Sequence, residues 1–401
     1  MNVAFLTGVK IDSLKQRGIY QDLLRKFTEE GHKVTIITPS ERREGEKTEM
    51  VDFGDYRILK VRTLNLQKAN LIEKGLATVA VEYQFVNAIK KYLTDQRFDL
   101  VLYTTPPITF VKAIKYLKKR DQALTYLLLK DIFPQNAVDM KMFSEKSFIY
   151  RFFRNKEKEL YQISDAIGCM SKANVEYILK HNPEINAEKV ENNPNSITPH
   201  QFEFNQDKIA ELKEKYSIPE GKTVFAYGGN LGRPQGIDFL LETIIKSENL
   251  NVFFLIIGIG TEFNRMENWF RKHKPTNAAL LKNLPKDDFD EILQACDVGL
   301  IFLDKKFTIP NFPSRLLSYL EMKLPVIAAT DSNSDVGDVV ENAGCGVKVI
   351  AGDIDTMIKT VEKYSDKVFL QTMKERCWKL LKDEYTVDYS YEIISNRLKH
   401  R

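Results

Sequence analysis

The sequence predicts an α/β protein built from two doubly wound, Rossmann-like domains that face each other across a cleft. Short apolar runs alternate with segments at helical spacing along the whole chain, which indicates parallel sheets covered by helices on both faces. The chain has 401 residues, too many for a single hydrophobic core. A break rich in Asn and Pro, ENNPNSITP at residues 191–199, divides the pattern into two halves.

The first half reads as a complete sheet with its helices. Apolar runs such as LVLY and LTYLLL are typical of buried parallel strands, and Gly31 ends the first helix. We assign residues 1–195 to an N-terminal domain. Strands are expected at residues 2–6, 33–38, 57–61 (an edge strand), 100–103, 124–129 and 166–170, and helices at 19–30, 74–92, 108–119, 148–162 and 174–181.

The second half repeats this organisation. We assign residues 196–382 to a C-terminal domain and residues 383–401 to a helix that packs back on the first domain. Strands are expected at residues 224–227, 252–257, 279–281, 298–302, 325–328 and 346–349, and helices at 237–246, 263–272, 289–296, 315–321 and 336–343.

Composition excludes several classes of protein. No run of about 18 apolar residues predicts a membrane span, and MNVAFLT at the start is not typical of a signal peptide, so a cytoplasmic location is expected. Four Cys without a CxxC pair and five His without ligand spacing predict no metal site.

Basic residues are concentrated in the first half. The net charge of +4 divides into +7 for residues 1–200 and −3 for residues 201–401. One basic cluster comprises Lys112, Lys115, Lys118, Lys119 and Arg120, and another is the aromatic segment SFIYRFFRNKEKELY at 147–161. These clusters favour an anionic membrane surface, such as the inner face of the cytoplasmic membrane, over nucleic acid as the partner. The alternative is a half-buried helix with a solvated charged face.

Two loops in the second half predict a diphosphate site. GGNLGRPQG at residues 228–236 joins a strand to a helix, and its glycines allow the backbone to approach a phosphate. FTIPNFPS at 307–314 leads into another helix, with Ser314 at the expected N-cap and Arg315 in the first turn. A cation is unfavourable there unless it binds an anion. Both loops lie at carboxyl ends of expected strands, where open α/β sheets bind ligands.

Six segments are distinctive along the chain: LTGVKIDSLKQRG, EEGHKVTIIT, LLLKDIFPQNAVD, NNPNSI, GGNLGRPQG and IPNFPSRLLSYLEMKLPVIAATD. Through them the chain resembles bacterial family-4 retaining glycosyltransferases of the GT-B fold. The similarity is greatest to capsule and O-antigen enzymes that include N-acetyl-fucosamine transferases. It implies a UDP-sugar donor held mainly by the second domain, a polyprenyl-diphosphate-linked saccharide acceptor, and no cofactor or metal.

The resemblance also implies roles for individual residues. The catalytic candidates are Asp131, Arg233 and Arg315, and Asp131 would orient a sugar hydroxyl, stabilise oxocarbenium charge or accept a proton. An N-cap or loop aspartate is the alternative for Asp131. The donor-binding candidates are Gly229, Asn230, Gln235, Asn283, Leu284, Asn311, Phe312, Ser314 and Ser318. Gly18, Arg151 and Arg154 are expected on the acceptor and membrane side.

The sequence departs from the family at four positions. Asn230 and Gln235 stand where many relatives carry Arg and Lys, and Pro310 and Ser318 stand where they carry glutamates. Arg233 and Arg315 are therefore expected to meet the phosphate charge, and each alanine variant to lose at least a hundredfold in turnover. Two alternatives stay open: a non-hydrolysing UDP-sugar 2-epimerase of the same fold, and a non-catalytic partner subunit.

Overall fold

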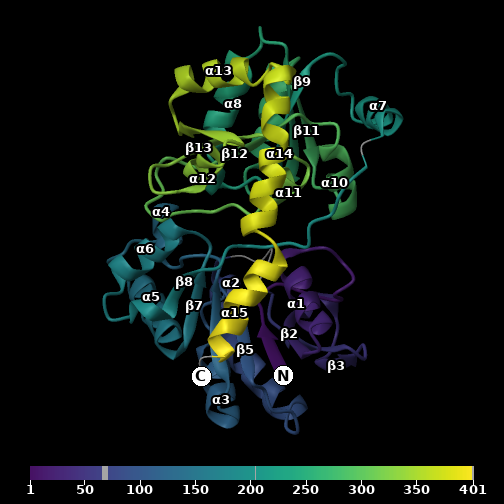
Figure 1. Ribbon diagram of the computed structural model, residues 1–401. Helices are drawn as coiled ribbons and strands as arrows, with labels where there is room; N and C mark the ends of the chain where they lie inside the picture. The colour runs from purple at the N-terminus through teal and green to yellow at the C-terminus, as the bar shows by residue number, and fades with distance from the viewer. Residues whose placement is uncertain (66–70, 204, 400–401) are drawn as a thin grey trace. The chain divides into compact units, whose positions relative to one another are not determined.

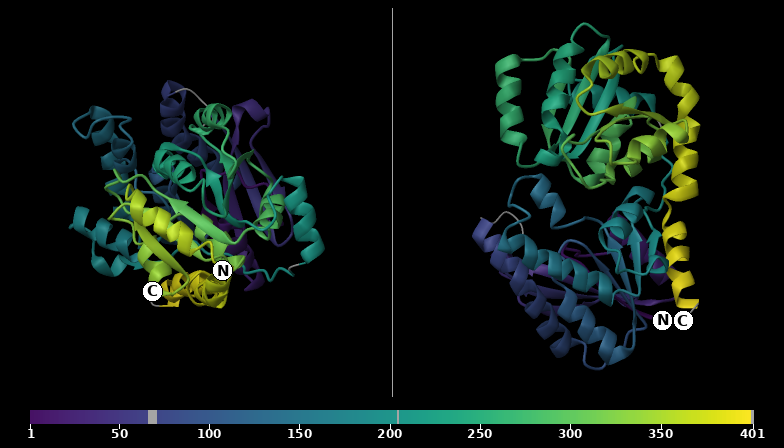
Figure 2. Two further views of the ribbon diagram at one scale, coloured as in Figure 1. Left: turned by 90° about the horizontal axis from the view of Figure 1, so that it is seen from above. Right: turned by 90° about the vertical axis from the view of Figure 1, so that its left-hand side faces the viewer.

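The computed structural model describes residues 1–65, 71–203 and 205–399, with the backbone alone for 71–77. The chain forms two compact units, Met1–Thr198 with Val387–Arg401 and Pro199–Thr386. Helices cover both faces of the sheet in each unit (Figures 1 and 2). Residues 400–401 of the expected C-terminal helix lie outside the described residues.

The N-terminal unit contains an eight-stranded sheet. Its strand order is β3-β4-β2-β1-β5-β6-β7-β8, parallel except for the antiparallel β3–β4 pair. The strands are β1 (Asn2–Leu6), β2 (Lys33–Glu41), β3 (Glu49–Asp52), β4 (Tyr56–Thr63), β5 (Leu100–Thr104), β6 (Leu124–Leu129), β7 (Ala166–Cys169) and β8 (Val190–Asn192). The helices are α1 (Ile19–Glu29), α2 (Leu71–Tyr92), α3 (Val111–Asp121), α4 (Gln135–Asp139), α5 (Phe148–Ile163), α6 (Lys172–His181) and α15 (Val387–Lys399).

Two features of this sheet differ from the sequence prediction. The strand expected at the edge, β4, is an inner strand, because the antiparallel β3 covers it. β3 has only four residues, Glu at one end and Asp at the other, so it lacks the apolar run by which the other strands are recognised. The Asn- and Pro-rich break also begins with a short strand, β8, which pairs with β7.

The last helix, α15, completes the N-terminal unit. Its Val387 and Ile394 belong to the same buried cluster as Leu24 and Phe27 of α1. The ring of Tyr391 packs edge-on against Phe27, with 4.9 Å between centroids. Burial of this apolar face stabilises α15 against the rest of the N-terminal unit.

The C-terminal unit contains a six-stranded parallel sheet of order β11-β10-β9-β12-β13-β14. The strands are β9 (Thr223–Asn230), β10 (Val252–Ile259), β11 (Ala278–Lys282), β12 (Val298–Phe302), β13 (Val326–Thr330) and β14 (Gly346–Ile350). The helices are α7 (Gln206–Lys215), α8 (Ile237–Lys246), α9 (Phe263–His273), α10 (Lys286–Leu293), α11 (Arg315–Glu321), α12 (Val336–Asn342), α13 (Ile354–Lys363) and α14 (Lys367–Glu384).

The glycine-rich loop is shorter than the sequence predicts. Residues 228–230 continue β9, and Gly229 pairs with Gly258 of β10. A Cβ at Gly258 would overlap the carbonyl of Gly229, so this pairing needs glycine. The remaining connection to α8 is a single 3-10 turn, Arg233–Gln235. A glycine-rich segment can thus form part of a β-strand, here because the backbones of β9 and β10 pack closely at Gly229 and Gly258.

Within the described part of the chain, no helix is long and apolar enough to span a membrane.

Candidate active site

The strand order of the C-terminal sheet creates a switch point between β9 and β12. From β9 the chain builds outward to β10 and β11, and from β12 it builds the other way to β13 and β14. β12 pairs with β9 only at Val298–Phe225 and Gly299–Ala226, whereas β9 pairs with β10 as far as Asn230. The carboxyl ends of β9 and β12 therefore separate, and ligands of open α/β sheets bind at such a position.

Tyr319 of α11 fills the gap between the two strands. Its hydroxyl accepts the Gly228 N–H at 3.0 Å and donates to the Leu300 carbonyl at 3.2 Å. A Cβ at Gly299 would overlap the ring of Tyr319. Burial raises the pKa of Tyr319, so the hydroxyl keeps its proton and both bonds. This anchor fixes α11 against the end of β9.

Arg315 lies one helical turn before Tyr319 and extends over the end of β9. Its guanidinium carbon is 4.3 Å from the ring centroid of Tyr227. Nη2 lies 3.5 Å from the Asn230 carbonyl oxygen, while the buried Nη1 has no partner among the described residues. A buried donor without an acceptor costs stability, so this geometry indicates a place for an external anion.

The two amide side chains of the glycine-rich segment form a hydrogen bond with each other. Asn230 Nδ2 donates to Gln235 Oε1 at 3.1 Å, and the Gly232 N–H donates to the same oxygen at 3.0 Å. Together they fix the turn beside Gly229, which faces the Arg315 guanidinium. The structure thus brings Gly229, Asn230, Gln235 and Arg315 together.

Arg233 stands apart from this group. Its side chain is 73% exposed, and its Nε lies 3.8 Å from Glu262 Oε1. Glu262 also pairs with Arg265 at 2.6 Å. The sequence predicts that the Arg233 guanidinium contacts the phosphates. In the structure it lies near the carboxylate of Glu262, just before α9.

The loop before α11 holds three of the predicted donor-binding residues in different settings. The Asn311 N–H donates to Ser334 Oγ at 2.9 Å, and its buried Nδ2 has no partner in the part of the chain that the structure describes. Phe312 is buried and stacks on Tyr385, with centroids 6.0 Å apart. Ser314 is the N-cap residue, but its side chain makes no capping bond to the described helix.

Three further residues at this end of the sheet have defined positions. Asn283 and Leu284 follow β11, the edge strand, two strands away from β9. Ser318 is half-buried, and its Oγ lies 3.5 Å from Lys286 Nζ, a residue that the sequence analysis did not single out. Lys286 is the first residue of the segment KDDFDE, whose net negative charge does not indicate an anion site.

In the N-terminal unit, Asp131 follows β6 and is half-buried. Its Oδ2 accepts a bond from Asn136 Nδ2 of α4 at 2.6 Å, and its N–H donates to Thr105 Oγ1 at 3.3 Å. Burial raises the pKa of Asp131 to about 6, although bonds from Ile132 N–H and Asn136 oppose the shift. Burial also lowers the pKa of the adjacent Lys130 to about 7. A carboxyl group that titrates near neutrality suits proton transfer.

The acceptor-side candidates differ in accessibility. Gly18 precedes α1, and its N–H donates to the buried Asp22 at 3.2 Å. Arg151 is exposed. Arg154 pairs with Glu157 at 2.6 Å and donates to Asn182 Oδ1 at 2.6 Å, so internal contacts occupy its guanidinium.

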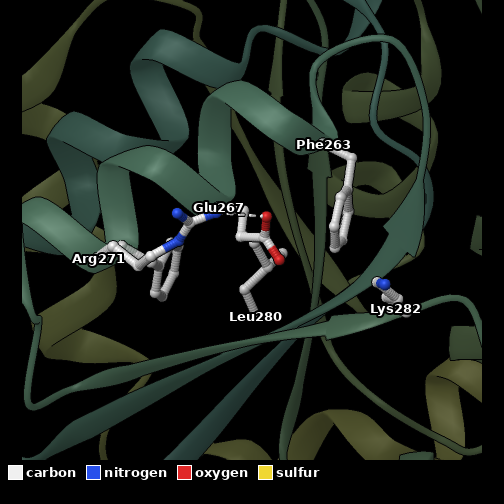
Figure 3. A pocket seen from close by; sticks show the side chains of 6 residues that line it. Phe263, Glu267, Arg271, Leu280 and Lys282 are labelled. Carbon is white, nitrogen blue, oxygen red and sulfur yellow. Dashed lines mark hydrogen bonds and ion pairs between the residues drawn. The ribbon is translucent and has the colours of Figure 1, made fainter.

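A cavity of about 440 Å³ lies between α9 and β11. Figure 3 shows Phe263 and Glu267 above Leu280, with Glu267 paired to Arg271 at 2.8 Å. It contains none of the predicted site residues. Across residues 1–65, 71–203 and 205–399, no cluster of His, Cys, Asp or Glu could hold a metal ion.

The sequence of the C-terminal unit identifies the activity. Residues 208–376 match the family model of group 1 glycosyl transferases. The chain is a glycosyltransferase. The probable glycosyltransferase WbjE of Pseudomonas aeruginosa is 25% identical to it over 340 residues, 82% of this chain and 80% of WbjE. The putative colanic acid biosynthesis glycosyl transferase WcaI of Escherichia coli K12 is 20% identical over 153 residues, 38% of each chain.

Solved structures confirm the GT-B fold of this glycosyltransferase. Sucrose-phosphate synthase from Thermosynechococcus elongatus superposes with a TM-score of 0.76 at 13% identity, covering 100% of this chain and 99% of that one. HepE from Anabaena in complex with UDP-glucose superposes with a TM-score of 0.70 at 14% identity, over the full length of both chains. The fold prediction, two Rossmann-like parallel-sheet units, is thereby confirmed.

Proposed function

We propose that the glycosyltransferase moves a sugar from a UDP-sugar to a saccharide acceptor with retention of configuration, without a metal ion. The observation that carries the proposal is the buried, unpartnered Nη1 of Arg315, which among the described residues has no acceptor beside the separated ends of β9 and β12. A diphosphate oxygen would satisfy it through a charge-assisted hydrogen bond. HepE, which shares the fold, binds UDP-glucose.

The chemistry needs an anion to be stabilised as it leaves. The bond from the anomeric carbon to the diphosphate breaks, and the acceptor oxygen forms a new bond to that carbon on the same face. The acceptor proton goes to the departing diphosphate, which completes the balance. Arg315 stabilises the charge that develops on the diphosphate, and a fixed donor is more effective there than a mobile one. Asp131 stays our candidate on the sugar side, and Arg233 a second candidate cation.

The identities of sugar and acceptor are a finer part of the proposal. We propose an N-acetylated hexosamine such as N-acetyl-fucosamine as the transferred sugar. The acceptor would be a polyprenyl-diphosphate-linked saccharide in capsule or O-antigen synthesis. The resemblance to that group of enzymes supports this, as does the similarity to WcaI, which is described as a colanic acid biosynthesis enzyme.

UDP is expected to bind the glycosyltransferase in the presence of EDTA. Arg315 and backbone N–H groups would replace the metal ion as the partners of the diphosphate. Titration calorimetry with UDP, with and without EDTA, measures this. Absence of binding at millimolar UDP, or binding that requires Mg²⁺, would contradict the proposal. A product assay separates transfer, which releases UDP, from epimerisation, which leaves the UDP-sugar intact.

We also propose that the segment 141–151 touches an anionic membrane. Large apolar side chains in it are exposed, at 51% for Met142, 82% for Phe148 and 52% for Ile149. Lys141, Lys146 and Arg151 of the same segment are exposed as well. Apolar side chains beside cations suit the boundary between headgroups and acyl chains. Arg154, which is engaged inside the unit, is left out of this surface.

The protein is expected to sediment with anionic vesicles at low salt and to be released at high salt. Each basic residue near the bilayer contributes about 1 kcal/mol, which salt screens. Phe148→Ser and the pair Lys146→Ser/Arg151→Ser should each reduce the bound fraction. Val368→Ser is the matched control, because Val368 is 78% exposed in the other unit. If the control variant loses as much vesicle binding as the test variants, the segment 141–151 is not the membrane-binding surface.

A further inference from the structure

Lys286 is held in a defined position at the end of the C-terminal sheet. It is the first residue of α10, and its amino group pairs with Asp290 one turn later in the same helix. The same amino group reaches Ser318 Oγ of α11 at 3.5 Å. Asp290 is 3% exposed, so the carboxylate is a buried anchor, whereas the Lys286 side chain stays 40% exposed.

This position belongs to the surroundings of Arg315. Ser318 follows Arg315 by three residues, and residues so spaced share one face of a helix. On the other side, Phe289 of α10 lies against Gly228 of β9, where a Cβ would overlap its ring. The end of β9, the start of α10 and α11 therefore surround one patch that carries two cations, Lys286 and Arg315.

One cation alone would not balance the negative charge of a diphosphate bound at this patch. Arg315 pairs with no carboxylate among the described residues, and a nucleoside diphosphate carries more than one negative charge. Arg233 lies near Glu262 instead. An ammonium group has three N–H donors and no acceptor. Asp290 and Ser318 engage two donors of Lys286, so one donor is left for an external oxygen.

We infer that Lys286 is a second cationic ligand for the diphosphate of the donor, positioned by Asp290 and Ser318. The inference rests on the proposed function, since it concerns the same site. Lys286 would approach the diphosphate from α10 while Arg315 approaches it from α11. Asp290 limits the mobility of the lysine side chain, which lowers the entropy lost on binding.

Calorimetry with three ligands tests the inference: UDP, inorganic pyrophosphate and uridine. Lys286→Met is expected to lower the affinity for UDP and for pyrophosphate about tenfold, because a phosphate contact is lost. The affinity for uridine, which has no phosphate, should not change. Lys286→Arg should recover most of the affinity. Lys282→Met, which removes an equal charge from an exposed lysine at the end of β11, should stay within about twofold of the wild type.

The variant Lys286→Met removes the ion pair of the buried Asp290 carboxylate, so folding needs its own control. The double variant Lys286→Met/Asp290→Asn also removes the charge of this carboxylate and should show the same tenfold loss. Pyrophosphate and UDP affinities within twofold of the wild type in both variants would overturn the inference, as would an equal loss for uridine. If Arg315→Ala abolishes UDP binding while the Lys286 variants still bind UDP, the proposed function stands and only the role of Lys286 fails. A wild-type protein that binds neither UDP nor pyrophosphate overturns both.

Discussion

Replacing Arg315 by alanine is expected to reduce turnover at least a hundredfold without lowering the stability of the fold. The loss follows from removing a fixed donor for a developing anion, which typically costs about 3–4 kcal/mol of transition-state stabilisation. Stability should hold because the cost of burying Nη1 without a partner among the described residues offsets the contacts of the guanidinium with the Tyr227 ring and the Asn230 carbonyl. Initial rates with a UDP-sugar and thermal unfolding of the same samples measure both effects.

Three variants sharpen this prediction. Arg315→Lys keeps the charge but not the planar group that stacks on Tyr227, so it should recover only part of the rate. Arg271→Ala, in the cavity of Figure 3, removes an equal charge and should leave the rate unchanged. Arg233→Ala should cost about tenfold, less than the sequence alone suggests, because the side chain is exposed and near Glu262. A near-normal rate for Arg315→Ala would remove this residue from the diphosphate site.

Asp131→Asn is expected to lose at least a hundredfold in turnover and to be more stable than the wild type at pH 7. Burial raises the pKa of Asp131 to about 6 in the folded protein, from a usual value near 3.8. Folding therefore favours the protonated form, and the wild type loses stability as the pH rises from about 4 to about 6. The neutral amide avoids this loss, a gain on the order of 2 kcal/mol at pH 7.

Unfolding measured between pH 4 and pH 8 checks the sign of this effect. The stability difference between Asp131→Asn and the wild type should nearly vanish at pH 4, where both side chains are neutral, and reach its full size above pH 6. Wild-type turnover should rise through pH 6 as the carboxylate forms. Asp139→Asn, in the nearby helix α4, is the control. Normal turnover in Asp131→Asn would show that Asp131 is a loop aspartate without a role in catalysis.

The sequence predicted those parts of the fold that burial governs. Strands such as β6 and β12 are buried at every position and nearly all apolar, so their pattern alone identifies them. β3 and β8 were missed because they have four and three residues, of which at least half carry polar side chains. Their place in the sheet depends on pairing with a neighbour, which a local pattern does not contain.

The site was predictable to the level of its loops but not of its contacts. Arg315 lies at the start of the helix that the sequence predicts, and its role as a phosphate ligand stays a prediction. The bond between Asn230 and Gln235 and the engagement of Arg154 by Glu157 depend on side-chain geometry. Lys286 was missed because its sequence neighbours are acidic and because its partner Ser318 is 32 residues away in the chain.

The return of α15 to the N-terminal unit sets an order of maturation during synthesis. A ribosome makes residues 199–386, the whole C-terminal unit, before it makes Val387 and Ile394, which fill the core of the unit begun first. Until then Phe27 lacks the aromatic ring of Tyr391, and Glu191 lacks its ion pair with Arg397. The nascent N-terminal unit thus exposes an apolar surface throughout the translation of the other unit. We expect chaperones to bind the chain mainly during this interval.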